Sequence, residues 1–482
     1  MISSYIKIYN NTSPINFNFF LISILLSIPA ILLGEWAILV LPLIVLIILS
    51  YIYGERFIIA LILISLFTLV GELNRSLRTA VQLIDLTLLG FLFIRSFGFN
   101  FNIYPRVPKP IIYFLILYFS AMVISSAVSS YPSAAIGIIT QQFAFFVIVY
   151  VFYSLIKDER DIHNYLFAIM IVAFILATVS LVLLFSTGFS LLDTFSKNRV
   201  RVSALITNAE ASSNFYLISF PFIIVLFLIK KNTLYRIITL LVALYFFLGL
   251  SLAMSRSAIL GIVLSTAIVF FILRRRRFYQ FALSIIILSL LFIFIEPLNE
   301  ILRLFLRIEE GVSARDYIWS MSLNIIRDYP VFGMGPGVYK YKVFNYFPYM
   351  FDSWWGGLMI YFYDITDGVN FSHNFFLVLF TEMGILGLMT AVTLPLIYIK
   401  IGIKTIKRYK NEIQEKYYLI VALFAIGISI IFRNFFNSIG ILYLGGITTD
   451  LPFWLIFGSL VYFYRVPINV NFTLQDEHTV RR

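Results

Sequence analysis

The chain has 482 residues, of which 61% are hydrophobic and 12% are charged, and its mean hydropathy is +0.95. Soluble domains carry about 25% charged residues, so this chain lacks the polar side chains that would cover a water-exposed surface. Its formal charge of +12 would suit nucleic acid in a soluble protein. Here the basic residues form short clusters between hydrophobic runs. We therefore expect the chain to lie in a lipid bilayer and not to bind nucleic acid.

Apolar runs of about 20 residues recur along the whole chain, and each could cross about 30 Å of hydrocarbon as a helix. Helices satisfy their own backbone in lipid, and the runs do not alternate as barrel strands would. The sequence therefore predicts an all-α polytopic membrane protein with about 12–14 transmembrane helices. No signal-peptide pattern precedes the first run, which we expect to remain as an anchor. The candidate spans are residues 17–33, 36–53, 57–70, 80–97, 111–129, 138–156, 163–186, 211–229, 235–254, 257–273, 278–295, 373–399, 417–436 and 451–464.

Basic residues set the predicted orientation, because cytoplasmic loops carry an excess of Lys and Arg. Arg274 to Arg277 separate two spans and should lie in the cytoplasm. Lys230, Arg106 and the lysine-rich segment 400–416 then fall on the same side, as do both termini. The extracytoplasmic face then receives segment 187–210, the Ser255-Arg256-Ser257 turn and the long loop 296–372.

The long loop divides the predicted organisation into four parts. Residues 1–295 hold about eleven N-terminal transmembrane helices, and residues 296–372 form the extracytoplasmic loop with short helices. Residues 373–464 hold the C-terminal transmembrane helices, and residues 465–482 form a cytoplasmic tail.

Two helices are predicted inside the loop, followed by a glycine-rich stretch. Asn299–Glu310 has the pattern of an amphipathic helix on the membrane surface. Ser313, with Asp316 three residues later, predicts the start of a second helix, which Pro330 ends. Next, Gly333, Gly335 and Gly337 permit positive φ and close backbone approach. Residues 339–363, beginning at Tyr339, are rich in aromatic side chains that could stack on sugar rings.

Two arginines at the predicted outer face are candidates for holding an anion. Arg256 begins a span, and its guanidinium presents a fixed fork of donors that suits phosphate. The alternative for Arg256 is snorkelling to the lipid headgroups. Arg315 begins the second loop helix, with Trp319 on the same face at i+4. The alternative for Arg315 is a surface arginine stacked on a tryptophan.

His373 begins a span at the same face, in the sequence Ser372-His373-Asn374. A histidine there could act as a general base or donate to a phosphate or sugar oxygen, or it could be an ordinary interfacial residue. No second histidine lies near it, so we expect no metal site.

Other polar residues and glycines of the last spans have structural or binding interpretations. Glu382 lies half a turn out of phase with His373, so we expect an arginine or a backbone donor as its partner. Gly384 and Gly387 permit close packing. Arg433, near the outer end of the next-to-last span, is either a substrate contact or an internal link between helices.

These residues occur in the order of a known family. The Ser255-Arg256-Ser257 turn, Arg315 with Trp319, the stretch from Tyr329 to Gly337, and the stretch from Ser372 to Leu388 follow one another along the chain. In this order the sequence resembles the O-antigen ligase and Wzy-type polymerase family, well over about residues 240–400 and by topology elsewhere.

The resemblance implies a GT-C-like glycosyltransferase of the cytoplasmic (inner) membrane that works at its outer face. Such enzymes pass a glycan from polyprenyl (undecaprenyl) diphosphate to a growing glycan, to lipid A-core or to protein, with inversion and without a metal or cofactor. Carried over, Arg256 and Arg315 would bind the diphosphate, and His373 would orient or deprotonate the acceptor. Trp319, Tyr339, Asn374 and Arg433 would contact substrate.

A different class of function remains open from the sequence. A transporter or flippase of lipid-linked glycan would need charged residues deep along a central path. The charged residues noted above gather near one predicted face, which favours the enzyme. Ligase and polymerase share these motifs, so the sequence does not separate them.

Overall fold

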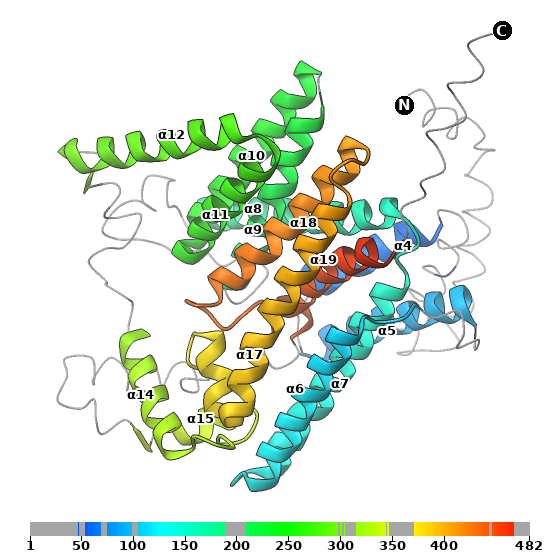
Figure 1. Ribbon diagram of the computed structural model, residues 1–482, viewed down its shortest axis with the longest axis vertical. Helices are drawn as coiled ribbons and strands as arrows, with labels where there is room; N and C mark the ends of the chain where they lie inside the picture. Colours follow the sequence, from blue (N-terminus) through cyan, green and yellow to red (C-terminus); the bar gives the residue numbers. More distant parts are fainter. Residues whose placement is uncertain are drawn as a thin grey trace.

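The computed structural model describes residues 54–68, 75–98, 105–186, 209–230, 232–296, 315–343, 371–442 and 446–466, with a few isolated positions besides. Within these ranges it contains fourteen α-helices and no β-strand, which confirms the all-α class (Figure 1). Eleven of those helices are long and apolar enough to cross a membrane. The chain is therefore a polytopic membrane protein.

The helices follow the predicted spans closely. Of the fourteen predicted runs, 17–33 and 36–53 lie outside the described residues, and each of the other twelve coincides with a helix. Most of the predicted helix Asn299–Glu310 and of the aromatic segment 339–363 also lies outside them. The helices are α4 (Glu55–Thr68), α5 (Arg75–Phe97), α6 (Lys109–Val128), α7 (Pro132–Ser154), α8 (Glu159–Ser186), α9 (Ala209–Ile229), α10 (Thr233–Ala253), α11 (Arg256–Leu273), α12 (Arg275–Phe294), α14 (Arg315–Asp328), α15 (Tyr339–Lys342), α17 (Phe375–Arg408), α18 (Gln414–Arg433) and α19 (Ile447–Arg465).

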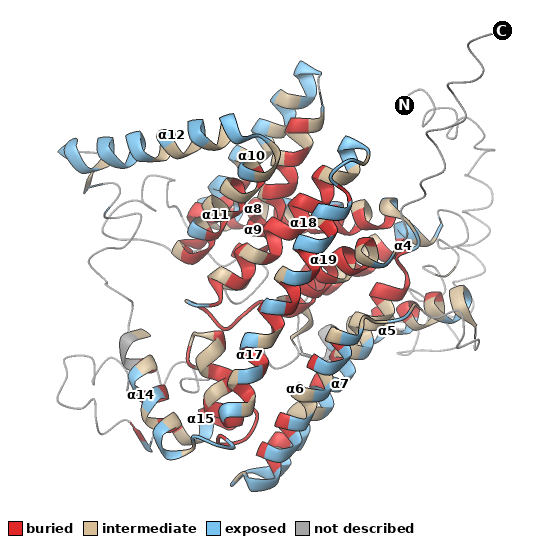
Figure 2. Cartoon of the chain, in the orientation of Figure 1, coloured by how far each residue is buried: buried red, intermediate tan, exposed pale blue. Residues whose placement is uncertain are grey.

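Three helices form the most buried part of the bundle. Most residues of α9, α18 and α19 are buried, whereas α12 carries no buried residue and projects away from the bundle beside α11 (Figure 2). Apolar side chains all around α9, α18 and α19 therefore pack against other helices. The apolar side chains of α12 are left for lipid.

The two ends of the bundle are fixed by contacts between helix termini. Arg433 at the end of α18 bonds to the first turn of α9, and Phe375 at the start of α17 bonds to the chain after α18. We call this end of the bundle the Glu210 end. At the other end, Arg408 of α17 donates to Tyr464 of α19. We call that one the Arg408 end.

The basic segments gather at the Arg408 end. Residues 105–108 precede α6 there, held by a bond from Tyr153 to the carbonyl of Arg106, and Lys416 at the start of α18 pairs with Glu159 of α8. The predicted orientation assigns these basic segments to one face, which agrees with the arrangement.

A break in α17 is filled by the glycine-rich stretch that follows α14. Gly384 has φ 60° and ψ −150°, so the helical hydrogen bonds are interrupted there. The N–H of Gly335 donates to the carbonyl of Glu382 (2.9 Å), and the N–H of Ile385 donates to the carbonyl of Pro330 (3.0 Å). The stretch thereby satisfies the backbone groups that the break exposes.

Positive φ angles at glycines make this docking possible. Gly333, Gly335 and Gly337 have φ of 70°, 117° and 69°. A Cβ on Gly333 would collide with the backbone of Glu382, and a Cβ on Gly384 would collide with the carbonyl of Val331. Only glycine allows the two backbones to lie this close.

Replacing Gly384 by alanine should therefore weaken the fold. The alanine methyl group would collide with the Val331 carbonyl, and the φ/ψ pair of Gly384 is unfavourable for any L-residue. We therefore expect the free energy of unfolding to fall by about 1–3 kcal/mol or more. Gly137 of α7 is the control, because a Cβ there meets nothing within 4 Å. The melting temperature of the detergent-purified protein should fall for Gly384→Ala and hold for Gly137→Ala. Equal melting temperatures would contradict the docking.

Candidate functional site

The carboxylate of Glu210, in the first turn of α9, joins elements from distant parts of the chain. One oxygen accepts a hydrogen bond from Arg315 at the start of α14, at 2.9 Å, with both side chains 16% exposed. The other oxygen accepts from the side-chain amide of Asn437. Glu210 therefore ties the loop helix α14 to the transmembrane bundle.

Arg433, at the end of α18, lies directly beneath this ion pair and is completely buried. Its guanidinium donates to the backbone carbonyl of Glu210 (2.5 Å), to the hydroxyl of Ser213 (3.0 Å) and to the amide oxygen of Asn214. All three acceptors belong to the first turns of α9. Arg433 thus links α18 to α9. This contact corresponds to the internal link between helices, one of the two interpretations of Arg433 drawn from the sequence.

The segment after Arg433 holds the start of α17. The N–H of Phe375 donates to the carbonyls of Asn434 (3.0 Å) and Asn437 (3.1 Å). Asn374 caps α17 by accepting from Phe376 and Leu377, and its amide donates to the carbonyl of Phe435 (2.8 Å). The position of Asn374 is therefore fixed as a helix cap, one residue from His373.

His373 adopts an uncommon backbone conformation between Ser372 and the cap. Its φ is +49°, a left-handed value that few residues other than glycine adopt. Its ring lies 4.7 Å from that of Phe371, and the side chain is half-buried. Strained backbone of this kind concentrates at functional sites, where the surrounding structure holds a side chain in a required direction.

Arg256 begins α11 at the same end of the bundle. Gly261 of α11 faces Leu217 of α9 and the carbonyl of Ser429 of α18, so the start of α11 lies level with Glu210 and Arg433. Ser255 at the N-cap makes no side-chain capping bond. The Ser255 side chain therefore does not cap the first N–H groups of α11, and the half-buried side chain of Arg256 belongs to the same helix start. Such an arrangement favours binding of an anion.

The two aromatic candidates differ in accessibility. Trp319 is half-buried on α14, one turn from Arg315, and its indole N–H is buried with no acceptor among the described residues. Tyr339 is 1% exposed, and its hydroxyl lies 3.1 Å from that of Ser322. Burial raises the pKa of Tyr339 well above its usual range. Tyr339 packs in the small core of α14 and α15 and does not face a surface that a sugar could reach.

Glu382 lies inside the bundle and away from His373. Its carboxylate lies close enough to the backbone N–H of Gly337 for that group to act on its charge. A Cβ on Gly387 would collide with the carbonyl of Leu379, so this glycine serves the turn around the α17 break. Glu382 and Gly387 therefore support the docked glycine-rich stretch.

Glu210 is absent from the candidates named from the sequence. One feature of the sequence could have indicated it: the carboxylate of Glu210 is followed by Ser212, Ser213 and Asn214 at the very start of a span. Polar groups at membrane depth are costly unless they are paired, so such a cluster indicates partners elsewhere in the protein. Within the described ranges, no three His, Asp or Glu side chains come together as metal ligands would.

A comparison with known families finds a match over part of the chain. Residues 240–392 match the family model described as O-antigen ligase. The match contains Arg256, Arg315 and His373, together with the α17 break. No curated protein matches the chain.

Replacing Arg433 by methionine should destabilise the protein strongly. Three neutral acceptors on α9 would lose their donor inside the bundle, which costs about 1–3 kcal/mol for each buried group left without a partner. The control is Arg276→Met, because Arg276 is exposed at the start of α12. Thermal unfolding in detergent should show a large decrease in melting temperature for Arg433→Met only. A small, equal effect in both variants would contradict the structural role.

Proposed function

We propose that this chain, which carries an O-antigen ligase family domain over residues 240–392, moves a glycan from a polyprenyl diphosphate carrier to an acceptor hydroxyl. The coarser function, a glycan-transferring protein of the membrane, follows from that domain and from the apolar helices. The carrier, the outer face and the residue roles are the proposal.

The main observation in support of this proposal is that Arg256, Arg315 and His373 each lie at the N-terminus of a helix at the Glu210 end. Helix N-termini carry partial positive charge, which favours phosphate. The first N–H groups of α17 are already bonded to Asn374, Asn434 and Asn437, so α17 contributes its dipole and the ring of His373. Arg256 and Arg315 add two guanidinium groups, of which that of Arg315 is paired with Glu210. A diphosphate at lipid headgroup depth is the ligand that best fits this combination.

The ion pair with Glu210 positions the guanidinium of Arg315 before substrate binds. Glu210 balances the charge of Arg315 and fixes its direction at 2.9 Å. As the sugar leaves the carrier, negative charge develops on the diphosphate, and Arg256 and Arg315 stabilise it. Electrostatic groups placed in advance lower a barrier without reorganising during the reaction.

His373 takes the acceptor's proton in the proposed reaction. The acceptor oxygen forms a bond to the anomeric carbon, the carbon–oxygen bond to the diphosphate breaks, and its electron pair leaves with the phosphate. Direct displacement of this kind inverts the anomeric carbon. The left-handed backbone of His373 supports this role, because it fixes the ring at the start of α17. The same step serves a ligase and a polymerase.

We expect His373→Ala to lower glycan transfer about 10²–10⁴-fold, the usual contribution of a general base. Arg256→Ala should lower it about 10²–10³-fold through lost charge stabilisation. Transfer is measured with purified protein and a lipid-diphosphate-linked donor, and melting temperature checks folding. The control is His163→Ala, since His163 lies in α8, packed against Phe222. Near-normal product from either test variant would overturn the assignment.

Deleting the protein from its host should change the surface glycan on a gel. A ladder reduced to one attached repeat indicates a polymerase. Loss of all attached glycan, with carrier-linked polymer accumulating, indicates a ligase. An unchanged surface glycan would contradict the proposed function.

A further inference from the structure

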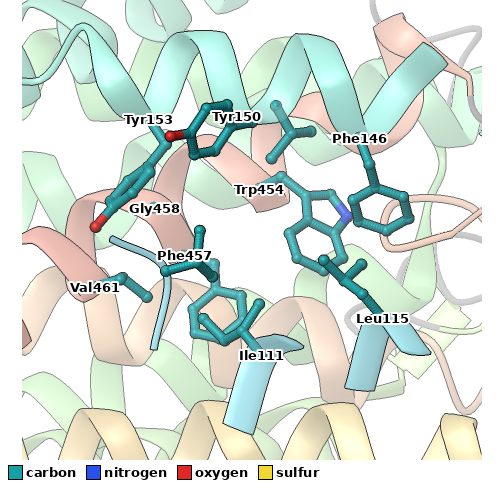
Figure 3. A pocket seen from close by; sticks show the side chains of 11 residues that line it. Ile111, Leu115, Phe146, Tyr150, Tyr153, Trp454, Phe457, Gly458 and Val461 are labelled. Carbon is teal, nitrogen blue, oxygen red and sulfur yellow. The ribbon is translucent and has the colours of Figure 1, made fainter. Parts of the chain in front are cut away.

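A groove of about 470 Å³ lies between α6, α7 and α19 (Figure 3). Its walls include Ile111, Leu115, Phe146, Tyr150, Trp454 and Gly458. The polar atoms on these side chains are already used: Tyr150 donates to the carbonyl of Pro105, and Trp454 to that of Ile441. A groove walled by carbon within transmembrane helices binds hydrocarbon better than water.

A second cavity, of about 520 Å³, lies next to the groove at the Arg408 end. Tyr153 lines both cavities. Its hydroxyl accepts a hydrogen bond from Arg465 at 2.6 Å and donates to the carbonyl of Arg106 at 3.4 Å. Tyr153 therefore separates the apolar groove from a cavity that an exposed guanidinium lines.

Three exposed cations at this end of the bundle have no carboxylate partner among the described residues. Arg106, Lys109 and Arg465 are exposed, and none forms an ion pair within the described residues. Two other cations of the Arg408 end, Arg56 and Lys157, pair with carboxylates at 2.5–2.6 Å. The carboxylates that act on Tyr462 of this cavity, those of Asp158, Glu159 and Asp161, are paired with Arg56 and Lys416. The exposed cations at this end are therefore free of them and can attract an anionic group.

We propose that this groove binds an anionic glycerophospholipid, with one acyl chain between α6, α7 and α19 and the phosphate beside Arg465. The chain fits the carbon walls, and the phosphate fits the guanidinium that Tyr153 orients. The site is independent of the proposed function. It occupies the half of the bundle toward the Arg408 end, whereas the carrier diphosphate belongs at the Glu210 end.

The headgroup half of the site is tested by lipid retention. The full chain is purified, stripped of lipid and incubated with phosphatidylglycerol or phosphatidylcholine of identical acyl chains, and bound lipid is counted by native mass spectrometry. The wild type should retain several-fold more phosphatidylglycerol. Arg465→Gln should abolish that preference, whereas Arg276→Gln, the same change on distant α12, should keep it. Equal retention of both lipids by the wild type would overturn the proposal.

The acyl-chain half is tested by filling the groove. A Cβ at Gly458 lies 3.6 Å from Tyr153, an ordinary contact, so Gly458→Ala should retain lipid normally. Gly458→Leu extends into the groove, favours the helix, and should reduce retention of both lipids several-fold. Unchanged retention in a folded Gly458→Leu protein would contradict the site. So would one-for-one displacement of phosphatidylglycerol by polyprenyl phosphate, which would assign the groove to the carrier.

Discussion

The arrangement of the Glu210 end depends on how one buried guanidinium is satisfied. Arg433 is completely buried, so it must find acceptors inside the bundle, and it finds them on the first turns of α9. This places the carboxylate of Glu210 above it, where Arg315 and Asn437 bind. Because Asn437 also accepts from the start of α17, the single charge fixes α9, α14, α17 and α18 relative to one another.

Much of the fold follows from local pattern, but the links between distant segments do not. Apolar runs and basic clusters predict the spans because lipid imposes length and charge rules on each segment separately. Glu210 gave only a weak signal, since its partners lie more than 100 residues away. Gly384 was interpreted as a packing position, and its φ of 60° arises from a stretch that docks across the helix. Arg256, Arg315 and His373 were proposed from their order along the chain, and only the structure shows that they lie at the same end of the bundle.

The two ends of the bundle have opposite chemical character. At the Glu210 end, helix N-termini and arginines surround a carboxylate, and the short helices α14 and α15 cover the start of α17 (Figure 1). The Arg408 end has basic segments and an apolar groove between α6, α7 and α19. The proposed transfer from a lipid-linked carrier would use both properties: a charged site for the phosphate, and a stable position in the bilayer that keeps this site at headgroup depth.

The membrane side of each end is the most direct test of this account. The chain has no cysteine, so a single introduced thiol is the sole target of a membrane-impermeant reagent. Cysteine at exposed Ser320 or Phe435 should react from outside intact cells, and cysteine at Arg276 or Lys410 should react only after permeabilisation. Labelling Ser320 and Phe435 from different sides, or either from the same side as Arg276, would contradict a shared diphosphate site.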